Sequence, residues 1–456
     1  MADSRDDLDT WLSEGVQPLP PPPGTFELIR KRARRRKVTR ALLAGAGAAA
    51  AIAFIATVPR LAISGLHTSP GHAASGLPAG HLQSAGAARA RARQHHTPGP
   101  ATPTPSPPPS GPPPAPPNFA AASVTFIGTQ TGWVMGQAGV PGHCGPPSAT
   151  ICTSIARTTD GGQTWSGVRA PVAGAPRGAS GISQIRFLNT SDGWAFGPQL
   201  YATHNGGRKW ARINTGGLRV TALETSGARV FAIWARCSGG GAFAAHCTDF
   251  TVYSAPAGGN QWTPVAGAAS STQAGALGSA QLVLTGTRAY LLAPGGQLSS
   301  GAVDGSAWQP AGPGPSAAAC DTGAAQPDGQ PSGELLAVTG SGTLVLTCGA
   351  SSPALYTSGD GGASWQQAGK VPGSAVAAVS GSPAGSIVVA TRAGIEVSAD
   401  GGAHWRAGKL PLPPGGFSYV GMTTSQQGVA VPADPSVHAI WLTYDGGKIW
   451  QKSPIP

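Results

Sequence analysis

A short peptide pattern recurs along the last three quarters of this 456-residue chain and constrains its fold more than any other feature. Five octapeptides, at 158–165, 203–210, 358–365, 398–405 and 443–450, fit the pattern [ST]-x-[DN]-G-G-x-x-W. Their defining residues are Asp160, Gly162, Trp165, Asn205, Gly207, Trp210, Asp360, Gly362, Trp365, Asp400, Gly402, Trp405, Asp445, Gly447 and Trp450. Weaker copies at 257–262 and 303–308 fill the gaps, so seven units of roughly 48 residues tile Phe119–Pro456.

The octapeptide has the chemistry of a tight β-hairpin turn. Its Asp or Asn side chain accepts hydrogen bonds from backbone N–H groups two or three residues later. The two adjacent glycines allow positive φ, and the Trp buries a large apolar area where the outgoing strand starts. Strand-like segments surround each turn, and four short strands per unit are typical of a propeller blade. The sequence therefore predicts an all-β fold, a seven-bladed β-propeller, over 119–456.

Composition agrees with this fold class. Gly (68) and Pro (44) are abundant and charged residues are only 11%, which excludes a coiled coil or helical bundle. Residues 119–456 hold 17 basic and 13 acidic side chains, so most of the net charge of +11 lies elsewhere. Because this region shows no basic stripe, we expect no nucleic-acid partner.

The octapeptides resemble the Asp-box, or BNR, repeat family, and the resemblance covers 119–456. The segments Thr131–Gly136 (TGWVMG) and Ser191–Gly197 (SDGWAFG) are also similar to the propellers of photosystem II assembly and stability factors. The resemblance implies seven blades and protein binding, without indicating the partner. In the Asp-box family these carboxylates lie on outer turns away from the central pocket, which implies that the octapeptide residues named above are structural.

The N-terminal quarter predicts a membrane anchor. Residues 41–58 form an uncharged run of 18 residues, long enough as a helix to cross the hydrocarbon core. Eight Lys and Arg residues at 30–40 precede it and orient that side toward the cytoplasm. We therefore expect a cytoplasmic tail with a basic juxtamembrane segment (1–40), a single transmembrane helix (41–58) and an extracytoplasmic remainder at the cell membrane. The alternative is a cleaved signal peptide with a long basic leader.

A stalk separates this anchor from the repeats. Residues 59–118 lack hydrophobic periodicity, and 12 of the 22 residues at 97–118 are Pro. Such a segment favours extended polyproline II conformation rather than a packed core. We expect 59–118 to be a disordered Pro-rich spacer.

All the cysteines follow the predicted anchor, which places them in an oxidising exterior. They are Cys144, Cys152, Cys237, Cys247, Cys320 and Cys348. Six cysteines allow 15 pairings, of which bonds between sequence neighbours are favoured: 144–152, 237–247 and 320–348. The C-x2-4-C spacing of a metal site is missing.

These features favour a tethered protein- or glycan-binding scaffold without catalysis. The long segments Gln137–Ile151, Cys237–Asp249 and Ala311–Gly333 are the candidate binding loops. No catalytic, cofactor-binding or metal-ligating residue is predicted. The sequence leaves the binding face and the oligomeric state open. Two alternatives stay open. The first is a purely structural envelope component. The second is a sialidase-like or other glycoside hydrolase acting on surface glycans, although after residue 118 the only glutamates that could serve as its carboxyl groups are Glu224, Glu334 and Glu396.

Overall fold

The computed structural model describes residues 113–138, 153–174, 181–238, 246–268, 280–293, 296–315, 334–349, 353–373 and 376–455. The chain divides into two compact units, 1–103 and 104–456, and all described residues belong to the second. The predicted tail, the predicted transmembrane helix and the stalk up to residue 112 lie outside the described residues. Within the described ranges, no helix is long and apolar enough to cross a membrane.

The described residues form strands grouped into seven four-stranded sheets. In chain order the strands are β1 (Ala120–Phe126), β2 (Gly132–Gln137), β3 (Thr153–Thr158), β4 (Ser166–Val168), β5 (Ile182–Phe187), β6 (Gly193–Pro198), β7 (Leu200–Thr203), β8 (Ala211–Arg212), β9 (Arg219–Ser226), β10 (Arg229–Ser238), β11 (His246–Pro256), β12 (Thr263–Pro264), β13 (Gln281–Leu284), β14 (Arg288–Leu292), β15 (Gln297–Ala302), β16 (Gln309–Pro313), β17 (Leu335–Val338), β18 (Leu344–Cys348), β19 (Ala354–Ser358), β20 (Gln366–Lys370), β21 (Ala378–Gly381), β22 (Ile387–Ala390), β23 (Ile395–Ser398), β24 (Arg406–Ala407), β25 (Phe417–Met422), β26 (Gly428–Pro432), β27 (Ala439–Thr443) and β28 (Gln451–Pro454).

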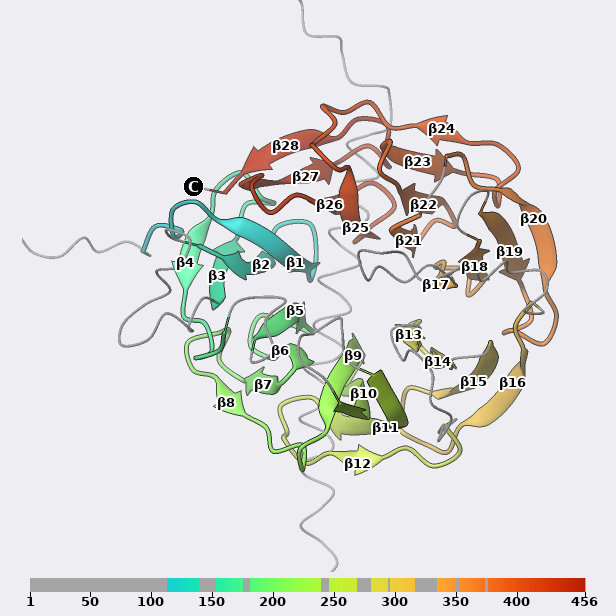
Figure 1. Cartoon of the computed structure of the whole chain (residues 1–456), viewed down its shortest axis with the longest axis horizontal. Coiled ribbons are helices and arrows are strands. Elements are labelled where there is room, and N and C mark those ends of the chain that lie inside the picture. The colour runs from blue at the N-terminus through green and yellow to red at the C-terminus, as the bar shows by residue number, and fades with distance from the viewer. Residues whose placement is uncertain are drawn as a thin grey trace, which may run out of the picture. The chain divides into compact units, whose positions relative to one another are not determined.

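Each sheet is an antiparallel meander of four consecutive strands, and the sheets stand in a ring (Figure 1). The first strand of every sheet lies nearest the centre, and the fourth lies at the rim. Neighbouring innermost strands pack against one another from β1 through β5, β9, β13, β17 and β21 to β25. This arrangement is a seven-bladed β-propeller, so the fold class predicted from the repeats is confirmed.

The hydrophobic core lies between the blades. Each apolar cluster combines residues of two neighbouring sheets, as where Phe231 of β10 packs with Leu291 of β14 and Trp308. The second strands are buried along nearly their whole length, as in β2 and β6. A strand with a blade on either side buries both of its faces, which explains its continuous apolar sequence.

The innermost strands are joined by polar side chains that bond the backbone or a side chain of the next blade. The Ile185 N–H donates to Ser123 Oγ (3.1 Å), and the Met422 N–H donates to Ser380 Oγ (3.1 Å). These bonds satisfy backbone groups that have no strand partner on the central side. The remaining links are Phe187 N to Thr125 Oγ1, Arg186 to Glu224, Ser226 Oγ to Thr285 O, Leu336 N to Gln281 Oε1 and Gln281 Nε2 to Glu334 O.

The ring closes without sharing a strand between the two ends of the propeller. Blade 1 is β1–β4 and blade 7 is β25–β28, and β1 packs on β26 and β27. Side-chain hydrogen bonds cross the interface between blades 1 and 7: Tyr444 OH to Gly161 O (2.7 Å), Ser453 Oγ to Gly162 O (2.7 Å), Trp165 Nε1 to Ser453 Oγ (3.3 Å) and Gln427 Nε2 to Thr129 O (3.0 Å). The octapeptide of blade 1 thus supplies much of the polar closure.

The last residues of the predicted stalk lie against blade 1. Pro114 forms a bridge with Ser166 of β4, and the Gly167 N–H donates to Pro113 O (2.9 Å). Ala115 is buried in the cluster that joins blades 1 and 7. The chain is therefore attached to the propeller several residues before β1 begins.

In four of the five octapeptides the second glycine lies against the third strand of the preceding blade; Gly207 is the exception. A Cβ added at Gly402 would overlap Leu355 Cδ2 of β19, whereas one added at Gly401 meets nothing within 4 Å. Both glycines have positive φ, +73° at Gly401 and +102° at Gly402. Both positions therefore require a positive φ, but they differ in the space available to a side chain.

Gly402→Ala is expected to destabilise the propeller more than Gly401→Ala. The left-handed backbone costs about 1–2 kcal/mol for a non-glycine residue at either position. The clash with Leu355 adds about 1–3 kcal/mol at Gly402 only. Denaturant unfolding followed by Trp fluorescence measures both variants. Equal losses would show that the second glycine has no role in blade packing.

Candidate functional site

The seven repeats connect the third and fourth strands of the seven blades. The octapeptides begin at the end of β3, β7, β19, β23 and β27, and the weaker copies at 257–262 and 303–308 lie between β11 and β12 and between β15 and β16. Hydrogen bonds join these turns to the turns between first and second strands, as from the Gly161 N–H to Gln130 O (2.9 Å). Both sets of turns therefore lie on one face of the ring, which we call the octapeptide face.

Within an octapeptide the Asp side chain accepts bonds from the turn around it. Asp160 Oδ1 accepts from the N–H groups of Gln163 and Thr164, both at 3.0 Å, and from the Thr158 hydroxyl at 2.7 Å. The Gly162 N–H donates to Thr158 Oγ1 (2.8 Å). Both carboxylate oxygens are engaged, because Thr164 Oγ1 donates to Oδ2.

The same bonds recur around Asp360, Asp400 and Asp445 and, with an amide in place of the carboxylate, around Asn205. Hydrogen bonds from Ser364 and Ser358 lower the pKa of Asp360, and bonds from His404 and Ser398 lower that of Asp400. Burial alone would raise the pKa of Asp160, but bonds from Thr164, Thr158 and Gln163 lower it to about 2. The ionised form is the one that the turn binds.

The closing Trp residues differ in what their indole N–H meets. Trp210 Nε1 donates to Arg169 O (2.9 Å) and Trp450 Nε1 to Gly447 O (3.2 Å). The indole nitrogens of Trp365 and Trp405 are buried without a hydrogen-bond partner. Packing between blades, rather than the indole hydrogen bond, is therefore the shared role of these residues.

The structure does not bring the octapeptides together into one site. They are spread around the rim, one to a blade, and their polar atoms bond mainly to their own turn. Among the described residues, no group of three or more His, Cys, Asp or Glu side chains is placed to hold a metal ion. This geometry supports turn-building rather than ligand binding.

Lowering the pH is expected to destabilise the propeller through these carboxylates. A carboxylate whose folded pKa is depressed stabilises the fold above its unfolded pKa of about 3.9, and that stabilisation is lost as pH falls toward its folded pKa. Unfolding should therefore become easier between about pH 4 and pH 2. The triple variant Asp160→Asn/Asp360→Asn/Asp400→Asn should have a lower melting temperature at neutral pH. Its melting temperature should also fall less than that of the unmodified protein between about pH 4 and pH 2. An equal fall in melting temperature in the variant and the unmodified protein would show that these carboxylates do not cause the loss of stability in acid.

A polar cluster lies where the innermost strands end toward the octapeptide face. Arg186 Nε of β5 is 3.1 Å from Glu224 Oε1 of β9, and the Arg186 side chain is 16% exposed. Tyr419 of β25 lines the same pocket of about 240 Å³. Burial raises the pKa of Tyr419, the charge of Arg186 opposes this and that of Glu224 adds to it. The cluster joins three blades across the centre.

This central pocket supplies one carboxylate. Glu224 is the only Asp or Glu among its described lining residues, and Arg186 pairs with it. Most glycoside hydrolases use two carboxyl groups, about 5–9.5 Å apart. The described residues of this pocket lack such a pair.

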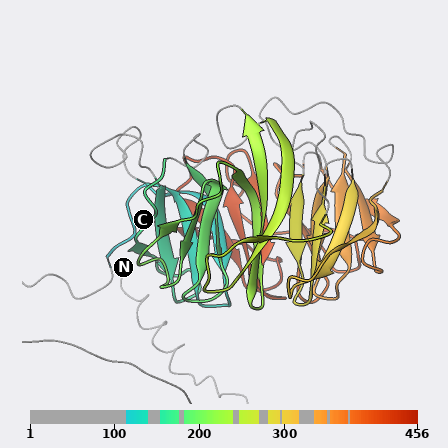
Figure 2. The same ribbon diagram turned by 90° about the horizontal axis from the view of Figure 1, so that it is seen from below.

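The opposite face carries the connections between second and third strands and those between blades. We call it the crossover face. Its most prominent feature is the hairpin of β10 and β11, drawn in lime green, which extends beyond the neighbouring strands (Figure 2). Cys237 and Cys247 face each other across this hairpin and form a disulfide, as the sequence predicted.

The structure describes only one of the other four cysteines. Cys348 at the end of β18 is disulfide-bonded. Cys144, Cys152 and Cys320 lie outside the described residues, so the 144–152 and 320–348 pairings stay predictions. The candidate loops Gln137–Ile151 and Ala311–Gly333 also lie largely outside them. Their described ends, after β2 and β16, point to the crossover face, because connections of these two types leave the strands on that side.

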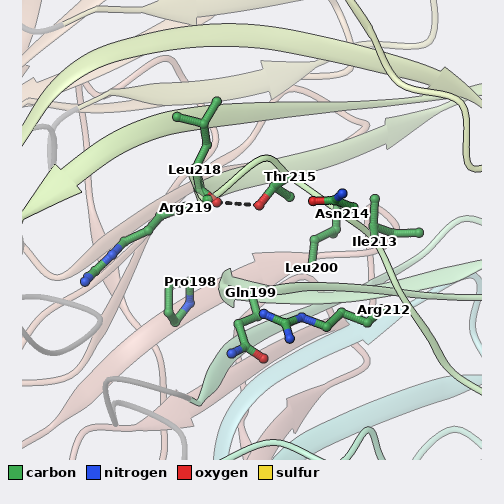
Figure 3. Close-up of a pocket in the computed structure, with 10 residues that line it drawn as sticks. Pro198, Gln199, Leu200, Arg212, Ile213, Asn214, Thr215, Leu218 and Arg219 are labelled. Atoms are coloured by element: carbon green, nitrogen blue, oxygen red, sulfur yellow. Dashed lines mark hydrogen bonds between the residues drawn. The ribbon is translucent and has the colours of Figure 1, made fainter.

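A pocket of about 470 Å³ lies on the crossover face between blades 2 and 3 (Figure 3). The β6–β7 connection forms one wall and the β8–β9 connection another. We call it the seam pocket. Its lining residues are Pro198, Gln199, Leu200, Arg212, Ile213, Asn214, Thr215, Gly217, Leu218 and Arg219. Two guanidinium groups and no carboxylate line it.

Sequence reasoning missed the seam pocket. Arg212 and Arg219 are seven residues apart in a chain with many arginines, so nothing in their spacing marks a site. They share a pocket because β8 ends blade 2 at the rim and β9 begins blade 3 at the centre. The available signal was the short, acid-free connection between them, residues 213–218 (INTGGL), which contains two adjacent glycines.

Comparisons with known proteins find only distant structural likeness. No protein-family model and no curated protein matches the chain. The solved structure of YCF48 bound to D1 peptide is 16% identical, covers 73% of this chain and 95% of its own, and has a TM-score of 0.48. A puromycin hydrolase is 14% identical over 76% of this chain and 54% of its own, with a TM-score of 0.45. The GH74 enzyme of Niastella koreensis is 11% identical over 73% and 71%, with a TM-score of 0.27.

Proposed function

We propose that this chain is a membrane-tethered, extracytoplasmic β-propeller that binds another protein or a glycan through its crossover face, without catalysis. The observation that carries the proposal is the contrast between the two faces. On the octapeptide face the polar atoms of the turns bond mainly within their own turn, and Glu224 in the central pocket is already paired with Arg186. The crossover face holds the projecting hairpin, the seam pocket and the described ends of the long connections.

The tethering part of the proposal rests on the sequence. The apolar run at 41–58, its basic N-terminal flank and the Pro-rich stalk are the features that support it. The disulfide in the β10–β11 hairpin agrees with an oxidising location.

The glycoside hydrolase alternative has less support. The central pocket offers Glu224 already paired with Arg186, and the seam pocket offers no carboxylate. The GH74 enzyme and the puromycin hydrolase are only 11% and 14% identical to this chain, and one fold can serve many unrelated functions. A binding role needs only the surfaces that the described residues provide.

A photo-crosslinking residue placed on each face tests the binding role in cells that carry the full chain. Val172, 70% exposed on the connection between blades 1 and 2, reports on the crossover face, and exposed Ala399 reports on the octapeptide face. We expect a discrete cross-linked partner from position 172 and none from position 399. Capture from 399 alone, or from neither position, would overturn the proposed binding face.

Protease treatment of the same intact cells checks the topology. A protease added outside should cleave the stalk and release the propeller. If the propeller stays attached while other surface proteins are cleaved, the extracytoplasmic assignment is wrong.

A further inference from the structure

Exposed hydrophobic side chains gather in one part of the ring. Four large hydrophobic side chains of the described residues are exposed. Two of them, Leu412 (51% exposed) and Ile449 (50%), lie in the connection that leads into blade 7 and in the octapeptide of that blade. Tyr444 (47%), a third, belongs to the same octapeptide. Single exposed hydrophobic residues are ordinary, whereas a group of them marks an interaction surface.

Hydrogen bonds hold the connection alongside the outer strand of blade 7. The Lys409 N–H donates to Lys448 O (2.8 Å), and the Trp450 N–H donates to Lys409 O (2.9 Å). Figure 1 shows β28, which follows Trp450, at the rim of the ring. We call the surface made of 409–413, Lys448, Ile449 and β28 the blade 7 edge.

The indole of Trp441 joins the two sides of this edge. Trp441 Nε1 of β27 donates to Pro411 O (2.9 Å), the residue before Leu412. Lys452 Nζ of β28 lies 5.9 Å from the centroid of the Trp441 ring. The connection and the outer strand therefore form one continuous surface.

The blade 7 edge is positively charged. Lys409, Lys448 and Lys452 are exposed, and they are three of the five lysines after residue 118. Neither 405–413 nor 446–456 contains an Asp or Glu, and no ion pair of the described residues involves these lysines. The adjacent Asp445 accepts hydrogen bonds from its own turn, and its single charge leaves the edge with net positive charge.

Lysines beside exposed aliphatic side chains fit one kind of surface. A bilayer of anionic lipids offers negative headgroups with acyl chains beneath them. A long lysine side chain can lay its stem on apolar groups and keep its ammonium at the headgroups. A soluble polyanion would make no use of Leu412 and Ile449, and an apolar protein surface would make none of the lysines.

The entry point of the predicted tether favours the same edge. Ala115, at the end of the predicted stalk, is buried in the cluster that contains Ile440 and Leu442 of blade 7. The chain therefore joins the propeller beside blade 7. A tether raises the effective concentration of the membrane, so a weak contact at this edge is sufficient.

We propose that the blade 7 edge rests on the anionic lipid surface of the membrane that tethers the chain, with its lysines at the headgroups and Leu412 and Ile449 inserted beneath them. This inference rests on the proposed tether and goes beyond the proposed function by giving the propeller a second membrane contact. A propeller held by its edge leaves both faces open to partners.

Lipid photo-crosslinking in proteoliposomes of the full chain tests the inference. A photo-crosslinking residue replaces Gln451, which is exposed on β28, and the vesicles contain equal amounts of phosphatidylcholine and phosphatidylglycerol. We expect position 451 to label phosphatidylglycerol preferentially. The variant Lys409→Gln/Lys448→Gln/Lys452→Gln should lower that labelling at least about fivefold, because each lysine near the surface adds to the attraction.

A matched control removes three charges elsewhere. Arg208, Lys209 and Lys370 are exposed cations on blades 2 and 5. The variant Arg208→Gln/Lys209→Gln/Lys370→Gln should label phosphatidylglycerol as strongly as the unmodified protein. An equal loss in this control would show general charge attraction and overturn the site.

A second variant tests insertion of the aliphatic side chains. Leu412→Ser/Ile449→Ser keeps the lysines and should lower labelling at least about threefold, because two apolar side chains no longer enter the acyl region. Unchanged labelling would show that charge alone holds the edge and would overturn the insertion.

Two further results would overturn the lipid contact. One is equal labelling of both lipids, and the other is capture of a protein instead of lipid from position 451 in cells. Flotation of the full chain with the same vesicles reports on the tether separately. If the chain floats while position 451 labels no lipid, this inference fails and the proposed tether stands. If the chain does not float, both fail.

Discussion

The structure depends on one constraint: every blade is apolar on both of its faces. A four-stranded sheet of this kind is stable only when another sheet covers each side, and a closed ring is the arrangement that covers both sides of all seven. The buried second strands β2 and β6 show the result, since nearly every residue in them is shielded. Because no strand is shared between blades 1 and 7, closure relies on packing and on side-chain bonds such as Tyr444 to Gly161.

The octapeptide turn meets this constraint at the rim. Its paired glycines reverse the chain between the third and fourth strands, and the second glycine leaves room for an aliphatic side chain of the preceding blade. Its carboxylate satisfies the turn's own N–H groups. Repetition of one motif thus builds both the turns and the contacts between blades, and the carboxylate or amide of each turn bonds mainly to its own turn.

The features that distinguish the crossover face arise where the repeats differ. The connections of the crossover face vary in length from blade to blade, and the β10–β11 hairpin and the seam pocket arise from such differences. The polar cluster of Arg186, Glu224 and Tyr419 lies at the centre, where three blades meet. Its charges are paired with each other, which favours a role in holding the innermost strands together.

The sequence by itself determined the blade number and the turn chemistry and favoured the Cys237–Cys247 pairing, because each depends on residues close together in the chain. Asp160 and Thr164, for example, are four residues apart and bond directly. Only the tertiary structure decided which polar residues meet across blades. Arg186 and Glu224 are brought together by the ring, and Arg212 and Arg219 line one pocket because the chain between them passes from the rim of blade 2 to the centre of blade 3. Such contacts depend on how whole sheets are placed, and no local pattern of residues records that placement.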